Sequence, residues 1–257
     1  MTVVTFTTDF GLADPYAGAM KGAVLSLAPD ATLIDISHGI PRHDVVAGAL
    51  ALAQAAPYFP PGSIHVAVVD PDVGGGRADI VVEAGGRFFV GPDNGVLSLA
   101  APPPRAAYRI ESAFFRRDSV SPTFHGRDVF APAAGRLASG HAAKDAGPPM
   151  PAIVDFPMPD GGTLRDDCQG LVLSIDNFGN LLTSLVGVGI EKGLWEMTCD
   201  GRSFDLLVGR TFCDVERGSL VLYVGSSGRV EVAVREGSAA ALTQARPGTQ
   251  LGLRRRS

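Results

Sequence analysis

The stretch from Ile64 to Arg77, IHVAVVDPDVGGGR, constrains the fold of this chain more than any other. Its first half is an apolar, largely β-branched run with the length of a strand that is buried on both faces. The strand must end at Asp70-Pro71, because proline donates no hydrogen bond to a sheet ladder and fixes its own φ. A glycine run and Arg77 follow. The pattern predicts a binding site at Asp70 and Arg77 on the edge of an open α/β sheet, although the same residue types also form ordinary turns.

The pattern over the first 140 residues favours an α/β domain with a mainly parallel central sheet. Apolar runs predict strands and Ala-rich or small-residue runs predict helices, in the order strand 2–8, helix 14–27, strand 32–36, helix 44–55 and strand 64–69. Asp14 is expected to be the N-cap of the first helix, with Pro15 at the first helical position. Gly85-Gly86 predicts a tight hairpin between two further strands. Strands that alternate with helices are typical of a parallel sheet that is covered on both faces.

The character of the chain changes after residue 147. Residues 147–162 hold five prolines and three glycines, a composition that suits a linker better than the interior of an element. Beyond residue 170, short apolar runs separated by glycine-rich turns predict strands at 171–175, 206–208, 219–224, 230–234 and 250–253. We therefore expect an α/β N-terminal domain over 1–150, a linker at 151–169 and a smaller all-β barrel or sandwich over 170–257.

Composition narrows the classes of function. The net charge of −5 argues against a protein that binds nucleic acid through a basic surface. Three cysteines without CxxC spacing indicate a reducing compartment and neither a disulfide framework nor a zinc site. No apolar run reaches the ~18 residues of a membrane span, and the N-terminus lacks a signal-peptide pattern. We expect a cytoplasmic protein that binds neither nucleic acid nor a membrane.

Several well-known catalytic motifs are missing from the sequence, including the Walker loop, GxGxxG, HExxH and GxSxG. The five histidines have no ligand-pair spacing, so a metal site is not expected. His65 lies inside an apolar strand and is predicted to be structural, whereas His125 lies on a turn before a helix and is the better catalytic candidate. An acid, a guanidinium and an imidazole together can orient a water molecule, with Asp70 or His125 as the base.

Six blocks of sequence occur in the order that characterises one family. They are TFTTDFG, VVDPDVGGGR, GPDNG, TFHGRDVFAPAAG, IDNFGN and SSGRVEVAV, and they span Thr5 to about Ala241. In these blocks the chain resembles the S-adenosyl-L-methionine (SAM) hydroxide adenosyltransferases, or adenosine-forming SAM hydrolases, which are relatives of the fluorinase and chlorinase enzymes. The resemblance implies that SAM and water react to give adenosine and methionine. It implies no cofactor, since SAM is itself the substrate.

The resemblance also assigns the catalytic residues, which fall on Asp70, Arg77 and His125. In the implied reaction, water attacks C5′ in line with the C–S bond, a step that positioning assists strongly. The sulfonium leaves as a neutral thioether, so no general acid is needed. The halogenating relatives carry tyrosine at the place of Asp70 and serine at the place of Gly126. The chain therefore resembles the water-using branch.

The resemblance implies ligand contacts in both domains. Asp9 matches the acid that binds both ribose hydroxyls, and Asn180 matches the asparagine that reads adenine. The other matches are Asp14 and Asp176 near the methionine ammonium, and Ser226 and Ser227 in a C-terminal contact segment with Glu231 and Val234 close by. In the family, the ligand lies between the N-terminal domain of one subunit and the C-terminal domain of its neighbour in a trimer. We therefore expect a homotrimer with its ligand site at the subunit interface.

One departure from the family pattern keeps other functions open. Asp72 stands where the family usually has glycine, which adds a negative charge beside Asp70 and is expected to require a less permissive backbone angle. One alternative is a halide-using 5′-halogenase, which Asp70 and Gly126 disfavour. The other is a non-catalytic adenosine- or SAM-binding protein, which has no need to keep Asp70 together with Arg77 and a catalytic histidine.

Overall fold

The computed structural model describes residues 2–156, 162–187, 190 and 192–256 of the chain. The chain divides into two compact units, which span Met1–Pro157 and Met158–Ser257. The predicted linker at 151–169 includes residues 157–161, which lie outside the described residues. Each unit has an apolar core of its own, as expected of a domain.

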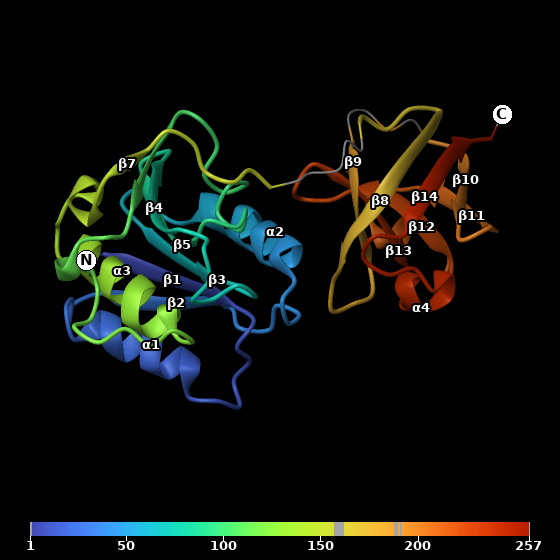
Figure 1. The fold of residues 1–257 in the computed structure, drawn as a ribbon. Helices are drawn as coiled ribbons and strands as arrows, with labels where there is room; N and C mark the ends of the chain where they lie inside the picture. The colour runs from blue at the N-terminus through green and yellow to red at the C-terminus, as the bar shows by residue number, and fades with distance from the viewer. Residues whose placement is uncertain (1, 157–161, 188–189, 191, 257) are drawn as a thin grey trace. The chain divides into compact units, whose positions relative to one another are not determined.

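The first unit contains a mixed seven-stranded sheet with the strand order β2-β1-β3-β5-β4-β6-β7 (Figure 1). Its strands are β1 (Val3–Thr8), β2 (Thr32–Ser37), β3 (Ile64–Val68), β4 (Asp79–Ala84), β5 (Arg87–Pro92), β6 (Arg105–Arg109) and β7 (Pro149–Met150). The strands β2, β1, β3 and β5 pair in parallel, whereas the pairs that involve β4, β6 and β7 are antiparallel. The prediction of a mainly parallel sheet is therefore right for one half of the sheet and wrong for the other.

The antiparallel half begins with the predicted hairpin of β4 and β5. Gly85 and Gly86 have φ values of 56° and 71°, as a two-residue type I′ turn requires. Within this hairpin β5 pairs with β3, and β4 lies on the outer side of β5. Sequence periodicity identifies both strands but does not show which of them pairs with β3. The tight hairpin makes β4 and β5 antiparallel to each other in either case.

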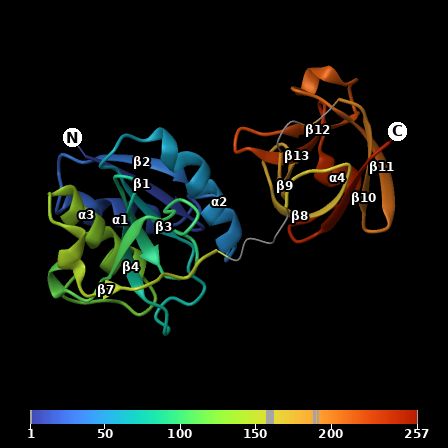
Figure 2. The same cartoon turned by 90° about the horizontal axis from the view of Figure 1, so that it is seen from above.

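Helices cover both faces of this sheet (Figures 1 and 2). They are α1 (Tyr16–Leu25), α2 (Val45–Ala55) and α3 (Ala131–Ala138). Val66 and Val68 of β3 belong to the core that α1 and α3 share, whereas Ala67 belongs to the core under α2. Alternate residues of β3 thus point into different cores, which explains why the whole strand is buried and its sequence is nearly all apolar.

The helix starts differ in how their first turns are capped. Asp44 caps α2, where its carboxylate accepts a hydrogen bond from the Ala47 N–H at 2.9 Å. The predicted cap of the first helix is wrong: Pro15 occupies the cap position of α1, and no side chain caps its first turn. A π-helical turn, η3 (Gly126–Phe130), precedes α3 and carries the chain from the predicted site into the helix.

The second unit contains a closed barrel with the strand order β10-β11-β12-β13-β9-β8-β14. Its strands are β8 (Asp167–Ile175), β9 (Leu181–Val186), β10 (Leu194–Cys199), β11 (Arg202–Val208), β12 (Leu220–Val224), β13 (Arg229–Val234) and β14 (Gln250–Arg255). The barrel agrees with the all-β prediction, but β9, β10 and the short helix α4 (Ala239–Thr243) were not predicted. Nearly every residue of β9 is buried, so that strand lacks the alternation that identifies a half-exposed strand.

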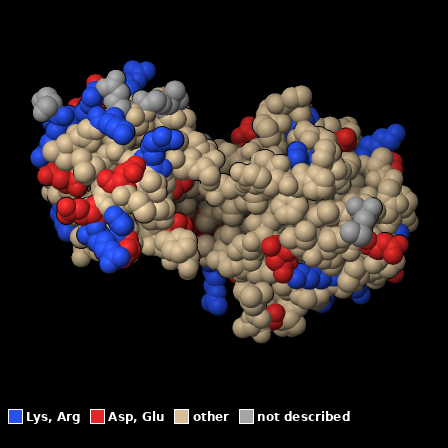
Figure 3. All heavy atoms as spheres, turned by 180° about the vertical axis from the view of Figure 1, so that it is seen from behind, with Lys and Arg blue, Asp and Glu red and all other residues tan. Residues whose placement is uncertain are grey.

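Two further features are the distribution of charge on the surface and the length and apolar character of the helices. Basic and acidic side chains are interspersed among larger neutral areas on the face that Figure 3 shows. None of the helices in the described residues combines the length and the apolar character that a membrane span requires.

Candidate active site

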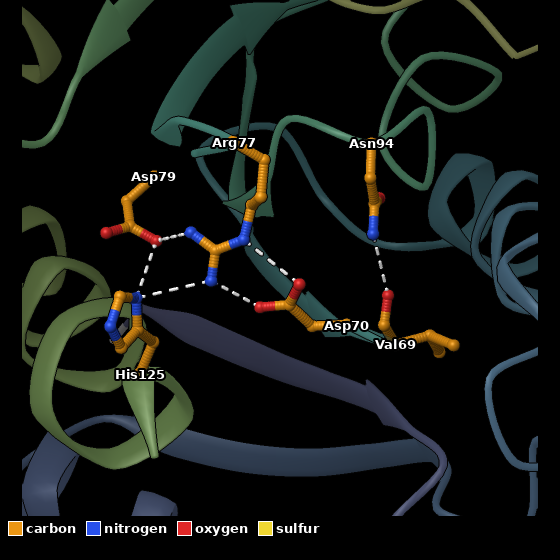
Figure 4. Close-up of polar contacts among 6 residues, drawn as sticks. All are labelled: Val69, Asp70, Arg77, Asp79, Asn94 and His125. Atoms are coloured by element: carbon orange, nitrogen blue, oxygen red, sulfur yellow. Dashed lines mark hydrogen bonds and ion pairs between the residues drawn. The ribbon is translucent and has the colours of Figure 1, made fainter. Parts of the chain in front are cut away.

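The predicted site begins where β3 ends. The strand stops at Val68, and Asp70 follows two residues later beside the turn after β5. Asn94 of that turn donates a hydrogen bond from Nδ2 to the Val69 carbonyl at 2.9 Å, and its Oδ1 accepts one from the Val96 N–H at 3.2 Å (Figure 4). The GPDNG block thus holds the backbone directly before Asp70 and fixes where the carboxylate emerges.

A glycine brings the loop after Asp70 against a distant segment. Gly74 has a φ of 77°, and a Cβ built at this position would overlap the carbonyl oxygen of Pro122. Only glycine therefore allows this left-handed bend and this close approach together. The contact joins the loop that leads to Arg77 with the segment that leads to His125, two residues that are far apart in the sequence.

Four charged or titratable side chains meet at this point (Figure 4). Arg77 donates from Nε to Oδ1 of Asp70 at 3.0 Å and from Nη2 to Oδ2 of the same carboxylate. Its Nη1 donates to Oδ1 of Asp79, the first residue of β4. The Arg77 and Asp70 side chains are only 8% and 3% exposed, so this pairing is a buried ion pair with a two-point geometry.

His125 completes this cluster of Asp70, Arg77, Asp79 and His125, which we call the polar cluster. Its Nδ1 lies 3.0 Å from Asp79 Oδ1 and 3.2 Å from Arg77 Nη2. The ring of Phe130 packs against Arg77 and His125. Its centroid lies 5.6 Å from the Arg77 guanidinium carbon and 6.4 Å from the His125 ring centroid. The structure therefore brings together the three residues predicted to be catalytic and adds a second carboxylate.

Opposite charges keep the guanidinium of this cluster ionised. Burial acts to lower the pKa of Arg77, but hydrogen bonds and charges from Asp70 and Asp79 more than offset this effect and raise the pKa above its ordinary value. Two carboxylates and one guanidinium leave a net charge of −1 beside His125 when both carboxylates are ionised. Such a site can hold a carboxylate oxygen in a fixed direction and can accept a proton from a bound water molecule.

A cavity of about 300 Å³ opens beside the polar cluster. Four of the predicted residues line it: Asp9, Asp14, Asp70 and His125. Arg77 is absent from this lining and instead contacts Asp70 and His125 from behind. Asp9 follows β1, and its Oδ2 accepts a hydrogen bond from the His43 backbone N–H at 2.9 Å. The ends of β1 and β3, which pair in parallel, thus meet at one edge as the sequence predicts.

Aromatic side chains form one wall of this cavity. The rings of Phe10, Tyr16 and Phe124 meet edge to face, with centroids 5.2–6.0 Å apart. A Cβ at Gly126 would lie 3.0 Å from the Met20 sulfur and 3.3–3.4 Å from two of these rings. Position 126 therefore has little room for a side chain, which gives the glycine of the HGRD segment a packing role.

A second cavity of about 700 Å³ lies in the barrel unit. The predicted residues that line it are Asp176, Asn180, Ser226, Glu231 and Val234. Ser227 is exposed in the turn between β12 and β13 and does not belong to this lining. Two phenylalanines and a tyrosine, Phe178, Phe212 and Tyr223, add flat apolar surface to the wall.

Asp176 organises the turn between β8 and β9. Its Oδ1 accepts hydrogen bonds from the backbone N–H groups of Phe178 at 2.9 Å and Asn180 at 2.8 Å, and its Oδ2 accepts one from Asn180 Nδ2 at 2.8 Å. Turn formation is the ordinary role of such an Asp, and here it also orients the Asn180 amide. Gly179 has a φ of 83° in this turn, where a Cβ would overlap the Ser238 side chain.

Glu231 pairs with a tyrosine across the two strands β12 and β13. Tyr223 and Glu231 are directly opposite in the ladder, and the Tyr223 hydroxyl donates to Glu231 Oε2 at 2.6 Å. Burial raises the pKa of Glu231, the hydrogen bond from Tyr223 acts against this, and the charge of Asp176 raises it further, with a net increase. Burial and the neighbouring carboxylate also raise the pKa of the Tyr223 hydroxyl, which stays protonated and donates.

Two other predictions concern residues outside these cavities. His65 is fully buried in β3, and its Nδ1 lies 2.8 Å from the Thr5 hydroxyl, in agreement with a structural role. Asp72 is exposed and is not among the residues with positive φ, so the expected backbone constraint at this position is wrong. The left-handed bend of this loop falls on Gly74 instead.

Sequence reasoning missed two polar residues of these sites. Asp79 is a carboxylate at the start of the strand β4, whose sequence is DIVVEA, and it lies two residues after Arg77. Its place directly before an apolar strand run was the available signal. Tyr223 becomes informative only once its ladder partner is known to be Glu231. Within the described part of the chain, no group of three or more His, Cys, Asp or Glu side chains is arranged to hold a metal ion.

Both units match models of one protein family. Residues 4–147 match the SAM hydroxide adenosyltransferase N-terminal domain, and residues 170–252 match the SAM hydroxide adenosyltransferase C-terminal domain. Together these matches cover most of the chain, in the order that the six sequence blocks predict.

Individual relatives agree with this match. A protein of Salinispora arenicola named (R)-S-adenosyl-L-methionine hydrolase is 42% identical over 253 residues, which cover 96% of each chain. The crystal structure of an uncharacterized conserved protein from Thermotoga maritima superposes with a TM-score of 0.90 at 28% identity and covers 99% of this chain and 100% of the other. A protein of Nocardia brasiliensis named fluorinase is 28% identical over an alignment of 269 positions, which covers 90% of this chain and 89% of the other.

Proposed function

The chain belongs to the SAM hydroxide adenosyltransferase family, and from this premise we propose that it hydrolyses S-adenosyl-L-methionine to adenosine and L-methionine at the polar cluster. The observation that carries the proposal is the buried ion pair of Asp70 and Arg77, which holds a carboxylate at the wall of a cavity that His125 and Asp9 share. A carboxylate and an imidazole at one cavity can both bind the same water molecule, or either of them can bind it alone.

The proposed step forms one bond and breaks one. The water oxygen bonds to C5′ while the C5′–S bond breaks. The electron pair of the C5′–S bond stays on sulfur, which becomes the neutral thioether of methionine. The water proton passes to Asp70 or to His125 and then to solvent. Arg77 stays charged and fixes the direction of the Asp70 carboxylate, so the rate arises mainly from positioning of the water.

The binding roles follow the two cavities. In the first unit, Asp9 is proposed to bind the ribose hydroxyls and Asp14 the methionine ammonium; both line the 300 Å³ cavity. In the barrel, the Asn180 amide is proposed to read adenine and Asp176 to lie near the methionine ammonium. Ser226, Ser227, Glu231 and Val234 are proposed as further ligand contacts. The flat rings of Phe178 and Phe212 in the same wall suit a planar base.

Isotope labelling gives the most direct test. Purified protein is incubated with SAM in H₂¹⁸O, and adenosine and methionine are followed by chromatography and mass spectrometry. We expect one ¹⁸O atom in the 5′-hydroxyl of adenosine and none in methionine. The Asp70→Asn variant is expected to lose turnover, whereas Asp72→Asn, which changes an exposed carboxylate of the same loop, is expected to keep it.

Two outcomes would contradict the proposal. Formation of a 5′-halo-5′-deoxyadenosine when chloride or fluoride is added would identify a halide-using enzyme. Retention of adenosine without any turnover would identify a binding protein. The Asp70→Asn variant shows whether any product comes from a trace contaminant, because contaminating activity would not depend on Asp70.

Three further proposals concern the oligomeric state, the cellular location and the cofactor requirement of the enzyme. We propose a homotrimer with its ligand site at the subunit interface, to be tested by light scattering of the eluted protein. We propose a cytoplasmic location, with support from the free state of Cys168, Cys199 and Cys213. We also propose that no cofactor takes part, so that dialysis against a chelator leaves the rate unchanged.

A further inference from the structure

The contacts of His125 point to a role for Asp79. We propose that Asp79 is a positioning residue, which holds His125 in the tautomer with the proton on Nδ1 and so keeps Nε2 as the acceptor that faces water. This inference rests on the proposed function, since it concerns the proton acceptor of the same site. It assigns a task to a carboxylate that contacts Arg77 and His125 but does not line the cavity.

The Nδ1 atom has two competing neighbours. It lies 3.0 Å from the Asp79 carboxylate, which only accepts hydrogen bonds when it is ionised, and 3.2 Å from Arg77 Nη2, which only donates. A protonated Nδ1 satisfies Asp79 and faces an N–H of Arg77, whereas an unprotonated Nδ1 satisfies Arg77 and faces a carboxylate. The two neighbours therefore favour opposite tautomers of the neutral ring, and the stronger of the two interactions determines which tautomer is populated.

The charges around the ring favour the proton on Nδ1. With both carboxylates ionised, Asp70, Arg77 and Asp79 together carry a net charge of −1, and the Asp79 oxygen lies nearer to Nδ1 than Arg77 Nη2 does. Arg77 already donates to both carboxylates through its other N–H groups, so it loses little when Nδ1 does not accept from it. A buried carboxylate that orients an imidazole and selects its tautomer is a known arrangement in catalytic sites.

The backbone holds Asp79 firmly in this position. It is the first residue of β4, where it is paired with Pro92 of β5, and its carbonyl accepts a hydrogen bond from the Ile110 N–H at 2.8 Å. The side chain is 14% exposed, as is that of His125. Asp79 is thus held in place and can orient the ring of His125, which comes from a turn far away in the sequence.

The opposite edge of the ring is left for chemistry. In Figure 4 the Nε2 atom of His125 points away from Arg77, Asp70 and Asp79. No side chain or backbone group in the described ranges forms a hydrogen bond with Nε2. With the proton on Nδ1, Nε2 carries the lone pair and can accept a proton from water; with the proton on Nε2, it cannot.

Loss of Asp79 should therefore reverse the tautomer. In Asp79→Ala, Arg77 Nη2 is the hydrogen-bond partner of Nδ1 that remains among the described residues, so Nδ1 becomes an acceptor and the proton moves to Nε2. Long-range ¹H–¹⁵N correlation spectra of ¹⁵N-histidine-labelled protein report the tautomer, and His125→Gln assigns the signal among the five histidines. We expect the Nδ1–H form in the unmodified protein and the Nε2–H form in Asp79→Ala, each at a pH at which the ring is neutral.

Kinetics provide the second readout. We expect kcat of Asp79→Ala to fall about 10²-fold, the contribution typical of a proton acceptor, with KM nearly unchanged. Asp79→Asn keeps an acceptor oxygen for Nδ1–H, so it should retain the Nδ1–H form and more activity than Asp79→Ala. Asp72→Ala removes a nearby exposed carboxylate and should change neither the tautomer nor kcat.

The outcomes separate this inference from the proposed function. The Nε2–H form in the unmodified protein, or an unchanged tautomer in Asp79→Ala, would overturn the inference whatever the activity. If Asp79→Ala does not fold, Asp79→Asn decides: the Nε2–H form in that variant with full kcat would equally overturn it. Absence of SAM hydrolysis by the unmodified protein would overturn the proposed function, while the spectra still show whether Asp79 sets the tautomer.

Discussion

The polar cluster and the barrel cavity use carboxylates in opposite ways. In the polar cluster, Asp70 and Asp79 both accept hydrogen bonds from the Arg77 guanidinium, so the buried charges are paired with each other. In the barrel cavity, Asp176 accepts from backbone and amide N–H groups, and Glu231 accepts from a phenol. Fixed opposite charges suit a site that must direct a reacting water, whereas neutral donors and acceptors suit recognition of a neutral base.

The difference also concerns what each site needs to remain intact. A paired buried charge depends on its partner, because removing one member leaves the other without compensation. Glu231 accepts from the Tyr223 hydroxyl on one oxygen, Oε2, so its carboxyl can become neutral and keep this partner. The following changes, taken in order of decreasing effect, test this contrast.

The largest effect is expected from removal of the arginine of the polar cluster. Arg77→Ala leaves Asp70 and Asp79 buried without a counter-charge, so the free energy of unfolding should fall by about 3–5 kcal/mol and activity by about 10²–10³-fold. Denaturant unfolding and adenosine formation measure the two effects. Arg77→Lys restores the charge but not the forked geometry, so it should recover stability better than activity. Equal recovery of both would contradict a positioning role for the fork.

The next effect concerns His65, a titratable group of the same unit outside the polar cluster. Burial, with a further contribution from the charge of Arg87, lowers the pKa of His65 from 6.5 to about 4. Between these values the unfolded chain binds the proton and the folded chain does not, so stability is lost as the pH falls from about 6.5 to about 4. The loss should reach about 3 kcal/mol.

Unfolding measured across this pH range in the unmodified protein and in His65→Gln tests the prediction. The variant lacks the titrating ring, so its unfolding free energy should depend less on pH in this window. An equal pH dependence in the two proteins would show that other groups dominate acid destabilisation.

A smaller effect is expected at the wall of the first cavity. In Gly126→Ala the new Cβ meets the Met20 sulfur at 3.0 Å and two aromatic rings, so the variant should be destabilised by about 1–3 kcal/mol. Gly22→Ala in α1 is the matched control, because a Cβ there meets nothing within 4 Å and alanine favours a helix. Thermal unfolding should thus shift in opposite directions for the two variants. A shift in the same direction would refute the packing role of Gly126.

The smallest effect is expected in the barrel cavity. Glu231→Gln replaces a half-buried carboxyl with an amide and keeps an oxygen that can accept from the Tyr223 hydroxyl. Because burial raises the pKa of Glu231, the folded state is favoured when this carboxyl is protonated, and stability is lost as the pH rises through that raised pKa. The variant should therefore be slightly more stable than the unmodified protein at neutral pH and not at acidic pH. Destabilisation at neutral pH would show that the charge itself is needed.

Much of this site could be predicted from the sequence, because its signals are local. Pro71 ends a strand wherever that strand lies in the sheet, so Asp70 had to follow a strand end. Gly85-Gly86 likewise determines a tight turn through backbone freedom alone. The order of the six blocks, from TFTTDFG to SSGRVEVAV, is by itself enough to identify the family.

The tertiary structure decided what depends on distant partners. Whether β4 or β5 pairs with β3 is a choice between two similar apolar strands, and only the packed sheet shows that β5 is the neighbour of β3. The antiparallel half arises from the β4–β5 hairpin and from the addition of β6 and β7 beyond it. Asp79 became part of the polar cluster because Gly74 lets its loop meet the segment before His125, a contact across more than one element. Local sequence determines turns and strand ends because φ limits act within single residues, whereas strand order and side-chain partners arise only when separate segments pack.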